Sequence, residues 1–223
     1  MENRITTLFG IRYPVVAGGM VWCSGWRLVR RQSAKAGGLG LIGSGSMTPE
    51  LLREHIRKCR AASSRPFGVN VPLAYRYAPQ LMDVITEERV PAVFTSAGQP
   101  RDLDRHVCTT RAAAWRTWCR VRNSRSRAAK RCGRRGGRGF EAGGHNGREE
   151  TTTMALVPQV RQAVDLPLIA AGGIATGAGM LAAFALGAEG CQLGRALHCR
   201  GRVRPAKAFK QRCVEVQEGA ARS

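Results

Sequence analysis

A histidine beside paired glycines is the strongest candidate for a catalytic residue in this sequence. His145 follows Gly143 and Gly144 in the run FEAGGHNG at residues 140–147. Glycines let the backbone pack against a flat ligand, and histidine is the side chain that titrates near neutral pH without help, so this pattern suits proton transfer. A histidine exposed in a loop, with no catalytic role, is the alternative that these residues leave open.

A second candidate is an anion site built from glycines. Gly172 and Gly173 end the apolar run at residues 166–171, and a predicted helix begins at Gly177. Paired glycines let an oxyanion come close to the backbone, and a helix N-terminus presents free N–H groups and the positive end of its dipole. Gly194 ends a further apolar run (GCQLG). We expect a phosphate to bind at these glycines; a plain glycine turn is the alternative.

Two more strand ends carry residues that suit a ligand. Gly18, Gly19 and Met20 follow the apolar run at residues 13–17, and Asn70 lies near the end of the run FGVNV. A buried amide needs hydrogen-bond partners, and the alternating donors and acceptors of a flavin edge would supply them. The alternatives are a core position followed by a turn at the first run, and an asparagine bonded to neighbouring backbone at the second.

A repeated alternation of strand and helix must position these candidates. Strands are predicted at residues 13–17, 39–42, 67–71, 92–95, 166–171 and 190–194, and helices at 26–36, from an N-cap at Thr48, 79–88, 152–164, 177–186 and 209–218. Such alternation indicates a parallel sheet covered by helices. Two further units between residues 95 and 152 would bring the strands to eight, the number of a (β/α)₈ TIM barrel, which carries its active site at the carboxyl ends of the strands.

Positive charge is concentrated in two segments that interrupt this alternation. The chain has 36 Lys and Arg against 15 Asp and Glu, a formal net charge of +21. Residues 105–138 hold eleven Arg and one Lys without any acid, and residues 195–207 are also rich in Arg. The first segment shows neither a strand-like run nor a helical stripe. We therefore expect a barrel that is incomplete or disrupted at residues 105–138 and truncated at its C-terminal end.

Several other classes of protein do not fit the sequence. The eight Cys form no CxxC pair and the four His add no zinc pattern, so we expect no metal site. The first ten residues lack the apolar core of a signal peptide, which favours the cytoplasm and reduced thiols. The uncharged stretch at residues 166–188 is long enough to span a membrane, but it contains Pro167 and five Gly, so we expect a strand, a turn and a helix there and no membrane partner.

Six motifs follow one another along the chain: YPVVAGGM (13–20), AGGLGLIGSGSM (36–47), PFGVNVPL (66–73), GFEAGGHNGREETTTMALVPQV (139–160), LPLIAAGGIATG (166–177) and LAAFALGAEGCQLG (181–194). In this order they resemble the nitronate monooxygenase family, formerly called 2-nitropropane dioxygenases, and the related flavin-dependent enoyl-acyl-carrier-protein reductases. The resemblance covers residues 4–104, 139–194 and 209–219. Because the family consists of FMN-dependent (β/α)₈ enzymes, it implies a single FMN-binding barrel domain over residues 1–223.

The resemblance also implies roles for the candidate residues. His145 matches the family's catalytic base, which takes a proton from the carbon beside a nitro group. The matching cofactor contacts are Gly18, Gly19, Met20, Asn70, Gly143 and Gly144 around the flavin ring, and Gly172, Gly173, Gln192 and Gly194 at the FMN phosphate. The implied monooxygenase reaction has a nitronate or nitroalkane reduce FMN and O₂ reoxidise it, with a carbonyl compound and nitrite as products.

Two other functions stay open beside this one. An NAD(P)H-dependent FMN oxidoreductase, such as an enoyl-thioester reductase, would use the same fold with NAD(P)H as a further partner. A nucleic-acid-binding module on the Arg-rich segment would have Trp115 and Trp118 for base stacking, but it lacks a motif scaffold. We therefore expect no specific nucleic-acid partner and only incidental, salt-dependent binding of polyanions.

A non-functional, frameshifted product is the remaining alternative. Residues 105–138 and 195–207 have the composition of a GC-rich gene read out of frame, while the family motifs on either side of the first segment keep roughly their usual separation. Arginine is almost never buried without a partner, so a barrel lacking two strands would expose its core and strand edges. On this hypothesis the chain folds poorly and binds FMN weakly or not at all.

Overall fold

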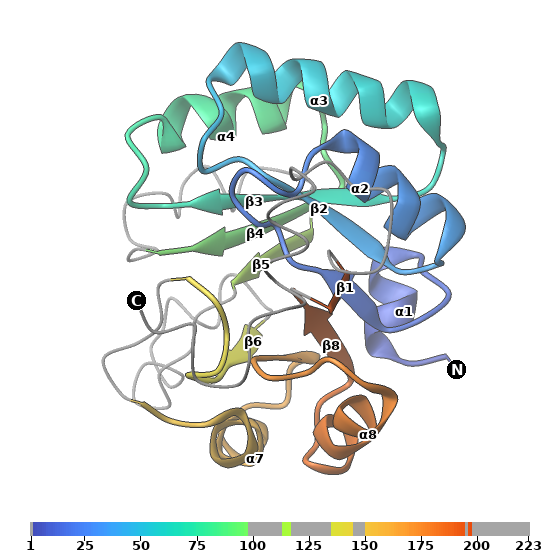
Figure 1. Ribbon diagram of the computed structural model, residues 1–223, viewed down its shortest axis with the longest axis vertical. Coiled ribbons are helices and arrows are strands. Elements are labelled where there is room, and N and C mark those ends of the chain that lie inside the picture. Colours follow the sequence, from blue (N-terminus) through green and yellow to red (C-terminus); the bar gives the residue numbers. More distant parts are fainter. Residues whose placement is uncertain (1, 98–112, 117–134, 145–149, 195, 198–223) are drawn as a thin grey trace, which may run out of the picture.

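Eight parallel strands form a closed barrel in the order β1 to β8. The computed structural model describes residues 2–97, 113–116, 135–144, 150–194 and 196–197. Helices lie on the outside of the barrel (Figure 1). This architecture confirms the (β/α)₈ prediction. The strands are β1 (Val15–Ala17), β2 (Leu39–Gly43), β3 (Phe67–Pro72), β4 (Ala92–Ser96), β5 (Ala113–Arg116), β6 (Arg135–Arg138), β7 (Leu168–Ala171) and β8 (Gly190–Leu193).

Most of the helices match the sequence periodicity to within one or two residues. They are α3 (Pro49–Ala62), α4 (Ala78–Glu87), α7 (Thr153–Ala163) and α8 (Gly177–Ala185). Thr48 is the N-cap of α3, as predicted, and its hydroxyl accepts the Leu51 N–H at 3.4 Å. The helix expected at residues 26–36 is divided into α2 (Trp26–Arg30) and a π-helical turn, η1 (Arg31–Lys35). The helix predicted at residues 209–218 lies outside the described residues.

One short helix was not predicted. The helix α1 (Arg4–Phe9) begins with a capping box, in which the Asn3 side chain accepts the N–H groups of Ile5 and Thr6 and the Thr6 hydroxyl accepts the Asn3 N–H. It ends at Gly10, which has a left-handed backbone with φ of 62°. Six residues are too few to show a periodic apolar stripe, so the capping residues are the only sequence signal for this helix.

The expectation that residues 105–138 contain no strand is wrong. β5 and β6 both lie in this segment; β5 pairs with β4 over four residues and β6 pairs with β7 over four. Strand formation depends more on the neighbouring strand than on intrinsic propensity, so backbone pairing outweighs a poor strand sequence here. Between β5 and β6, however, the register has a single residue pair, Arg116 with Arg135. The barrel is therefore closed by the fewest paired residues between β5 and β6, inside the Arg-rich segment.

The interior of the barrel is apolar and is closed at its amino end by α1. Phe9 on α1 stacks on Phe94 on β4, with ring centroids 5.9 Å apart, and Ile5 packs in the same cluster. The Asn3 amide donates to the Glu189 backbone oxygen, just before β8, at 2.6 Å. Two larger apolar clusters lie outside the strands. One fills the space between β2–β4 and the helices α2, α3 and α4, and the other fills the space between β7–β8 and the helices α7 and α8. The carboxyl ends of the strands are thus the end left for a ligand.

Candidate functional site

The segment after β1 meets the ends of β3 and β8. The Gly18 N–H donates to the Leu193 backbone oxygen at 2.8 Å, and a Cβ added at Gly18 would lie 3.1 Å from Gln192 Nε2. At Gly19 an added Cβ would lie 2.4 Å from the Cβ of Asn70, which is closer than two non-bonded carbon atoms can approach. The structure therefore brings four of the predicted residues together at the carboxyl end, and Gly19 must be glycine because Asn70 occupies the space of a side chain.

Asn70 presents a buried amide at this end of the barrel. Its residue exposure is 7%, and its Nδ2 donates to Ser96 Oγ at 3.1 Å. Its backbone oxygen accepts from the hydroxyl and the N–H of Ser44. Among the residues that the structure describes, Asn70 Oδ1 has no hydrogen-bond partner. Because a buried acceptor without a donor is costly, this oxygen suits the N–H of a bound ligand.

A buried serine holds the loop that carries Met20. Ser24 Oγ accepts the Met20 N–H and donates to the Gly18 backbone oxygen, both at 2.9 Å, and the Ser24 backbone oxygen accepts the Gly43 N–H at the same distance. The Met20 sulfur faces Gly194, where an added Cβ would lie 3.9 Å from Sδ. Sequence reasoning missed Ser24, because a serine that bonds within its own loop leaves no spacing pattern.

The glycines after β7 form a turn that requires glycine. Gly172 has φ of 123° and Gly173 has φ of 64°, and a Cβ at Gly172 would lie 2.5 Å from Thr153 Oγ1. The turn leads into α8, whose N-cap Thr176 accepts one N–H of the first turn at 3.1 Å; no acidic residue lies in that turn. Gly194 follows the neighbouring strand β8. An exposed backbone and the positive end of a helix dipole at this place suit a phosphate group.

A carboxylate and a threonine fasten the loop between β6 and α7. Glu141 Oε2 accepts the N–H of Thr153 at 2.9 Å and lies 3.0 Å from its hydroxyl, and the Phe140 N–H donates to the Thr151 backbone oxygen at 2.9 Å. Gly144, with φ of 84°, lies between these fastened ends. Sequence reasoning gave Glu141 and Thr153 no role, although Glu141 stands only four residues before the candidate base.

His145 itself, with residues 146–149, lies outside the described residues, so its role as the base stays a prediction. The histidine that the structure does describe, His55 on α3, has a structural role: its Nδ1 accepts the Trp26 N–H at 3.3 Å. Burial lowers the pKa of His55, which favours the neutral ring that this hydrogen bond requires. Gly143 and Gly144 are exposed, as expected for a loop that faces a ligand or solvent.

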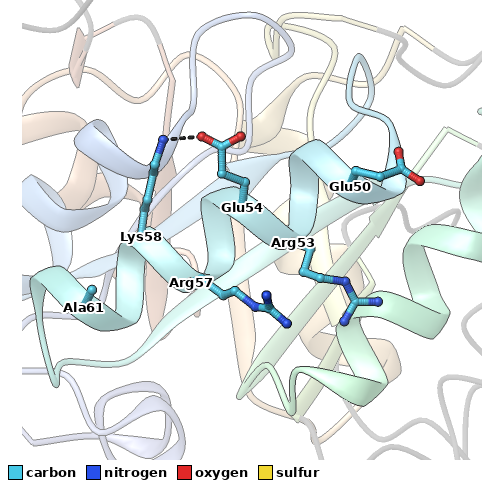
Figure 2. Close-up of a pocket in the computed structure, with 6 residues that line it drawn as sticks. All are labelled: Glu50, Arg53, Glu54, Arg57, Lys58 and Ala61. Carbon is cyan, nitrogen blue, oxygen red and sulfur yellow. Dashed lines mark hydrogen bonds and ion pairs between the residues drawn. The ribbon is translucent and has the colours of Figure 1, made fainter.

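A groove of about 500 Å³ on α3 is not this site. Figure 2 shows the lining side chains, which all come from α3: Glu50, Arg53, Glu54, Arg57, Lys58 and Ala61. Lys58 pairs with Glu54, and Arg53 and Arg57 donate to Glu88 at 3.1 and 3.0 Å. The groove is thus a solvated helix face on the outside of the barrel, where Arg53, Glu54, Arg57 and Lys58 are already paired.

A metal site, a reactive thiol at Cys59 or Cys191 and a membrane-spanning helix find no support in the described part of the chain. No group of three or more His, Cys, Asp or Glu there could hold a metal ion. Burial raises the pKa values of the Cys59 and Cys191 thiols to about 12, so neither is a reactive thiolate at neutral pH. No described helix is both long and apolar enough to cross a membrane.

Comparison with known proteins points to one family. The family model described as nitronate monooxygenase matches residues 2–88 and 74–220. An octahydro-1H-indene-4-carboxyl-CoA dehydrogenase of Rhodococcus jostii is 35% identical over 199 residues, which cover 87% of this chain and 54% of the relative. The chain thus spans about half the length of this curated relative.

Two solved structures share the barrel. FabK from Thermotoga maritima is 38% identical with a TM-score of 0.88, over 97% of this chain and 69% of that one. A nitroalkane oxidase from Streptomyces ansochromogenes is 27% identical with a TM-score of 0.80, over 92% of this chain and 71% of that one. Both likenesses extend over nearly the whole of the present chain.

Proposed function

This chain belongs to the nitronate monooxygenase family, and from that premise we propose that it is an FMN-dependent oxidoreductase. It oxidises nitronates or nitroalkanes to a carbonyl compound and nitrite, with O₂ as the final electron acceptor. The observation that carries the proposal is the contact of Gly19 with Asn70, where backbone and a buried amide meet at the carboxyl end of the barrel. This is the end at which (β/α)₈ enzymes hold their ligands.

The residues at this end fit FMN. Asn70 Oδ1 would accept an N–H of the flavin ring, and the ring would lie against Gly18, Gly19 and Met20, which present backbone and one soft side chain. The phosphate would bind at Gly172, Gly173 and Gly194 and at the N-terminus of α8, with Gln192 on the strand that leads to it. These residues together would form the FMN cradle, and none of them lies in the Arg-rich segment at 105–138.

The chain's own groups would handle the proton and the substrate. His145 would take the proton from the carbon beside the nitro group, or hold the nitronate already formed. Glu141 and Thr153 would position His145, because they fasten both ends of its loop at 2.9 and 3.0 Å. Met20, at the mouth, would help to exclude water from the reacting carbon. When bound, FMN supplies the electron transfer that no side chain provides.

A second candidate function is the NAD(P)H-dependent reduction of an unsaturated acyl thioester. It is favoured by the higher identity with FabK, 38%, than with the nitroalkane oxidase, 27%. The curated CoA dehydrogenase also acts on a thioester by its name. Both functions would use the same FMN cradle and differ in what reduces the flavin.

Anaerobic reduction of the FMN-loaded chain separates the two functions. We expect ethylnitronate to bleach the flavin absorbance much faster than NADPH does. Fast bleaching by NADPH, with none by ethylnitronate, would support the thioester reductase instead. Bleaching by neither donor would contradict both.

The same assay tests the base. In His145→Ala, reduction by neutral nitroethane should fall by about 10²–10⁴-fold, because its carbon must first lose a proton. Reduction by preformed ethylnitronate, which has already lost that proton, should fall far less. Equal losses with the two substrates would show that His145 is not the base.

A further inference from the structure

The loop after β1 holds a large aromatic side chain out in solvent on a strained backbone. Trp22 is 83% exposed, and its φ of 64° lies in the left-handed region that tryptophan rarely adopts. An exposed indole makes few contacts that could stabilise the fold. Strain of this kind persists where the surrounding structure enforces it and is concentrated at ligand sites.

The surroundings of Trp22 do enforce it. Ser24 ties the loop back to Gly18 and Met20 at 2.9 Å, and the N–H groups of Cys23 and Ser24 both donate to the Met20 backbone oxygen. Val21 packs against Gly45 in the loop after β2, where an added Cβ would lie 2.9 Å from Val21 Cγ2. The indole is therefore held by a rigid loop at the rim of the candidate site, two residues from Met20.

This part of the rim carries no charged side chain, although the chain as a whole carries +21. Residues 13–26, through β1 and its loop, contain no Asp, Glu, Lys or Arg, and neither do residues 43–48 after β2. Next to Trp22, Val21 is 41% exposed. An anionic or strongly hydrated group would find no charged partner from these two loops, whereas an alkyl chain or ring would lose water on contact with them.

We propose that Trp22 is a specificity-determining residue whose indole binds the apolar body of the substrate. The substrate class is then a nitronate whose reacting end lies at the flavin and whose alkyl or ring portion extends over Trp22 and Val21. The inference rests on the proposed function for the reacting end, but the apolar contact itself does not depend on which group reacts.

A series of nitronate substrates of increasing alkyl length tests this inference on the FMN-loaded protein. With primary nitronates of two to eight carbons, kcat/KM should rise with length in the unchanged chain. In Trp22→Ala the value should fall by about tenfold at six carbons and by less than about twofold at two carbons, because only longer chains lose apolar contact. Trp22→Phe should restore most of the difference. Leu181→Ala on α8, which removes another exposed apolar side chain, should leave the series unchanged.

A binding measurement keeps the inference independent of turnover. Hexanoate and acetate carry two oxygens as a nitronate does but cannot be oxidised in this way, and their binding is followed by the shift of the flavin absorbance. Hexanoate should bind about tenfold more tightly than acetate, and Trp22→Ala should abolish this preference. If the preference is present and lost as expected while no nitronate reacts, the apolar site stands and the proposed reaction fails. If nitronates react and Trp22→Ala affects all lengths equally, the reaction stands and the inference is overturned.

Discussion

Shape complementarity between two unreactive residues organises the candidate site. Gly19 and Asn70 come from the ends of β1 and β3, and the absent side chain of one makes room for the other. This places a buried amide oxygen at the barrel mouth with no partner among the described residues, although its Nδ2 is bonded to Ser96. The most constrained residue of the site is thus a glycine.

Gly19→Ala should disrupt the site and the fold together. The new methyl group would lie 2.4 Å from Asn70 Cβ and 3.2 Å from the Ile42 backbone oxygen, so Asn70 or the β1 loop must move. We expect the free energy of unfolding to fall by about 1–3 kcal/mol, as for other overpacked positions, and FMN retention to be lost. Chemical denaturation and a flavin absorbance spectrum measure both effects.

Gly179→Ala on α8 is the matched control for stability. An alanine methyl there would meet only ordinary contacts, at 3.5 Å or more. Helix propensity predicts unchanged stability or a gain of about 0.5–1 kcal/mol. If Gly19→Ala is as stable as this control, the close contact with Asn70 does not constrain the site.

Much of the site could be predicted from the sequence, but not the residues that hold it in place. Glycines and an asparagine at the ends of apolar runs are visible as patterns, and the structure gathers Gly18, Gly19, Asn70 and Gln192 at one end. Ser24 and Thr153 each make several hydrogen bonds that hold a loop, and no fixed spacing in the chain indicates them. Such contacts appear only once the backbone is folded.

At the scale of elements, one buried carboxylate joins α3 to the end of α4. Glu88 follows α4 and is 9% exposed; its carboxylate accepts from Arg57 at 3.0 Å and Arg53 at 3.1 Å. Arg60 donates to the backbone oxygens of Glu88 and Arg89, which adds positive charge at the negative end of the α4 dipole. Three arginines of α3 thus bind the C-terminal end of α4.

The stability that Glu88 contributes should depend on pH. Desolvation raises the pKa of its carboxyl group, but hydrogen bonds from Arg57 and Arg53 outweigh that effect, so the folded pKa lies below the ordinary value of 4.5. A lowered folded pKa means that the stabilisation is present above the ordinary value and is lost as the pH falls through the folded pKa. Glu88→Gln should reduce the free energy of unfolding by about 1–3 kcal/mol at neutral pH.

Denaturation at neutral and acidic pH checks this assignment. The difference between the unchanged chain and Glu88→Gln should shrink as the pH falls below 4.5, because Glu88, once protonated, is as uncharged as the glutamine that replaces it. Glu54→Gln, which removes an exposed carboxylate paired with Lys58 on the same helix, should change stability little at either pH. A Glu88→Gln difference of constant size across the pH range would argue against the arginine network.

The junction of β5 and β6 should be the first part of the barrel to open. These strands share one residue pair, whereas β3 and β4 share five. Local opening requires less free energy where fewer backbone hydrogen bonds and buried contacts must break. Hydrogen exchange should therefore show the amides of β5 and β6 exchanging well before those of β3 and β4. Equal protection of the two pairs would mean that the junction is as firm as the rest.

β5 and β6 are also the strands that could not be predicted from the sequence. The other six strands have short apolar runs that can be read directly, and their bounds differ from the predicted ones by about two residues. β5 (AAWR) and β6 (RGGR) have no such run, so only the neighbouring strands β4 and β7 explain their conformation. The helix α1 was missed for a different reason, since it depends on a capping box and not on periodicity.

For the whole molecule, the large net positive charge acts against the compact fold. A net charge of +21 opposes compaction by self-repulsion and attracts anions without specificity, FMN included. The closed barrel removes the reason for expecting weak FMN binding, because that expectation depended on two missing strands. Flavin held by the cradle and flavin attracted by charge differ in one respect: salt screens the second far more than the first.

The most direct test of this account is therefore flavin retention at raised salt. The purified chain is mixed with FMN, freed of unbound flavin by gel filtration in moderate salt, and examined by absorbance. We predict about one FMN per chain with a perturbed flavin band, and loss of that band in Gly19→Ala. A folded chain that retains no flavin, or releases it whenever salt is raised, would contradict the claim that the carboxyl end of this barrel is an FMN site.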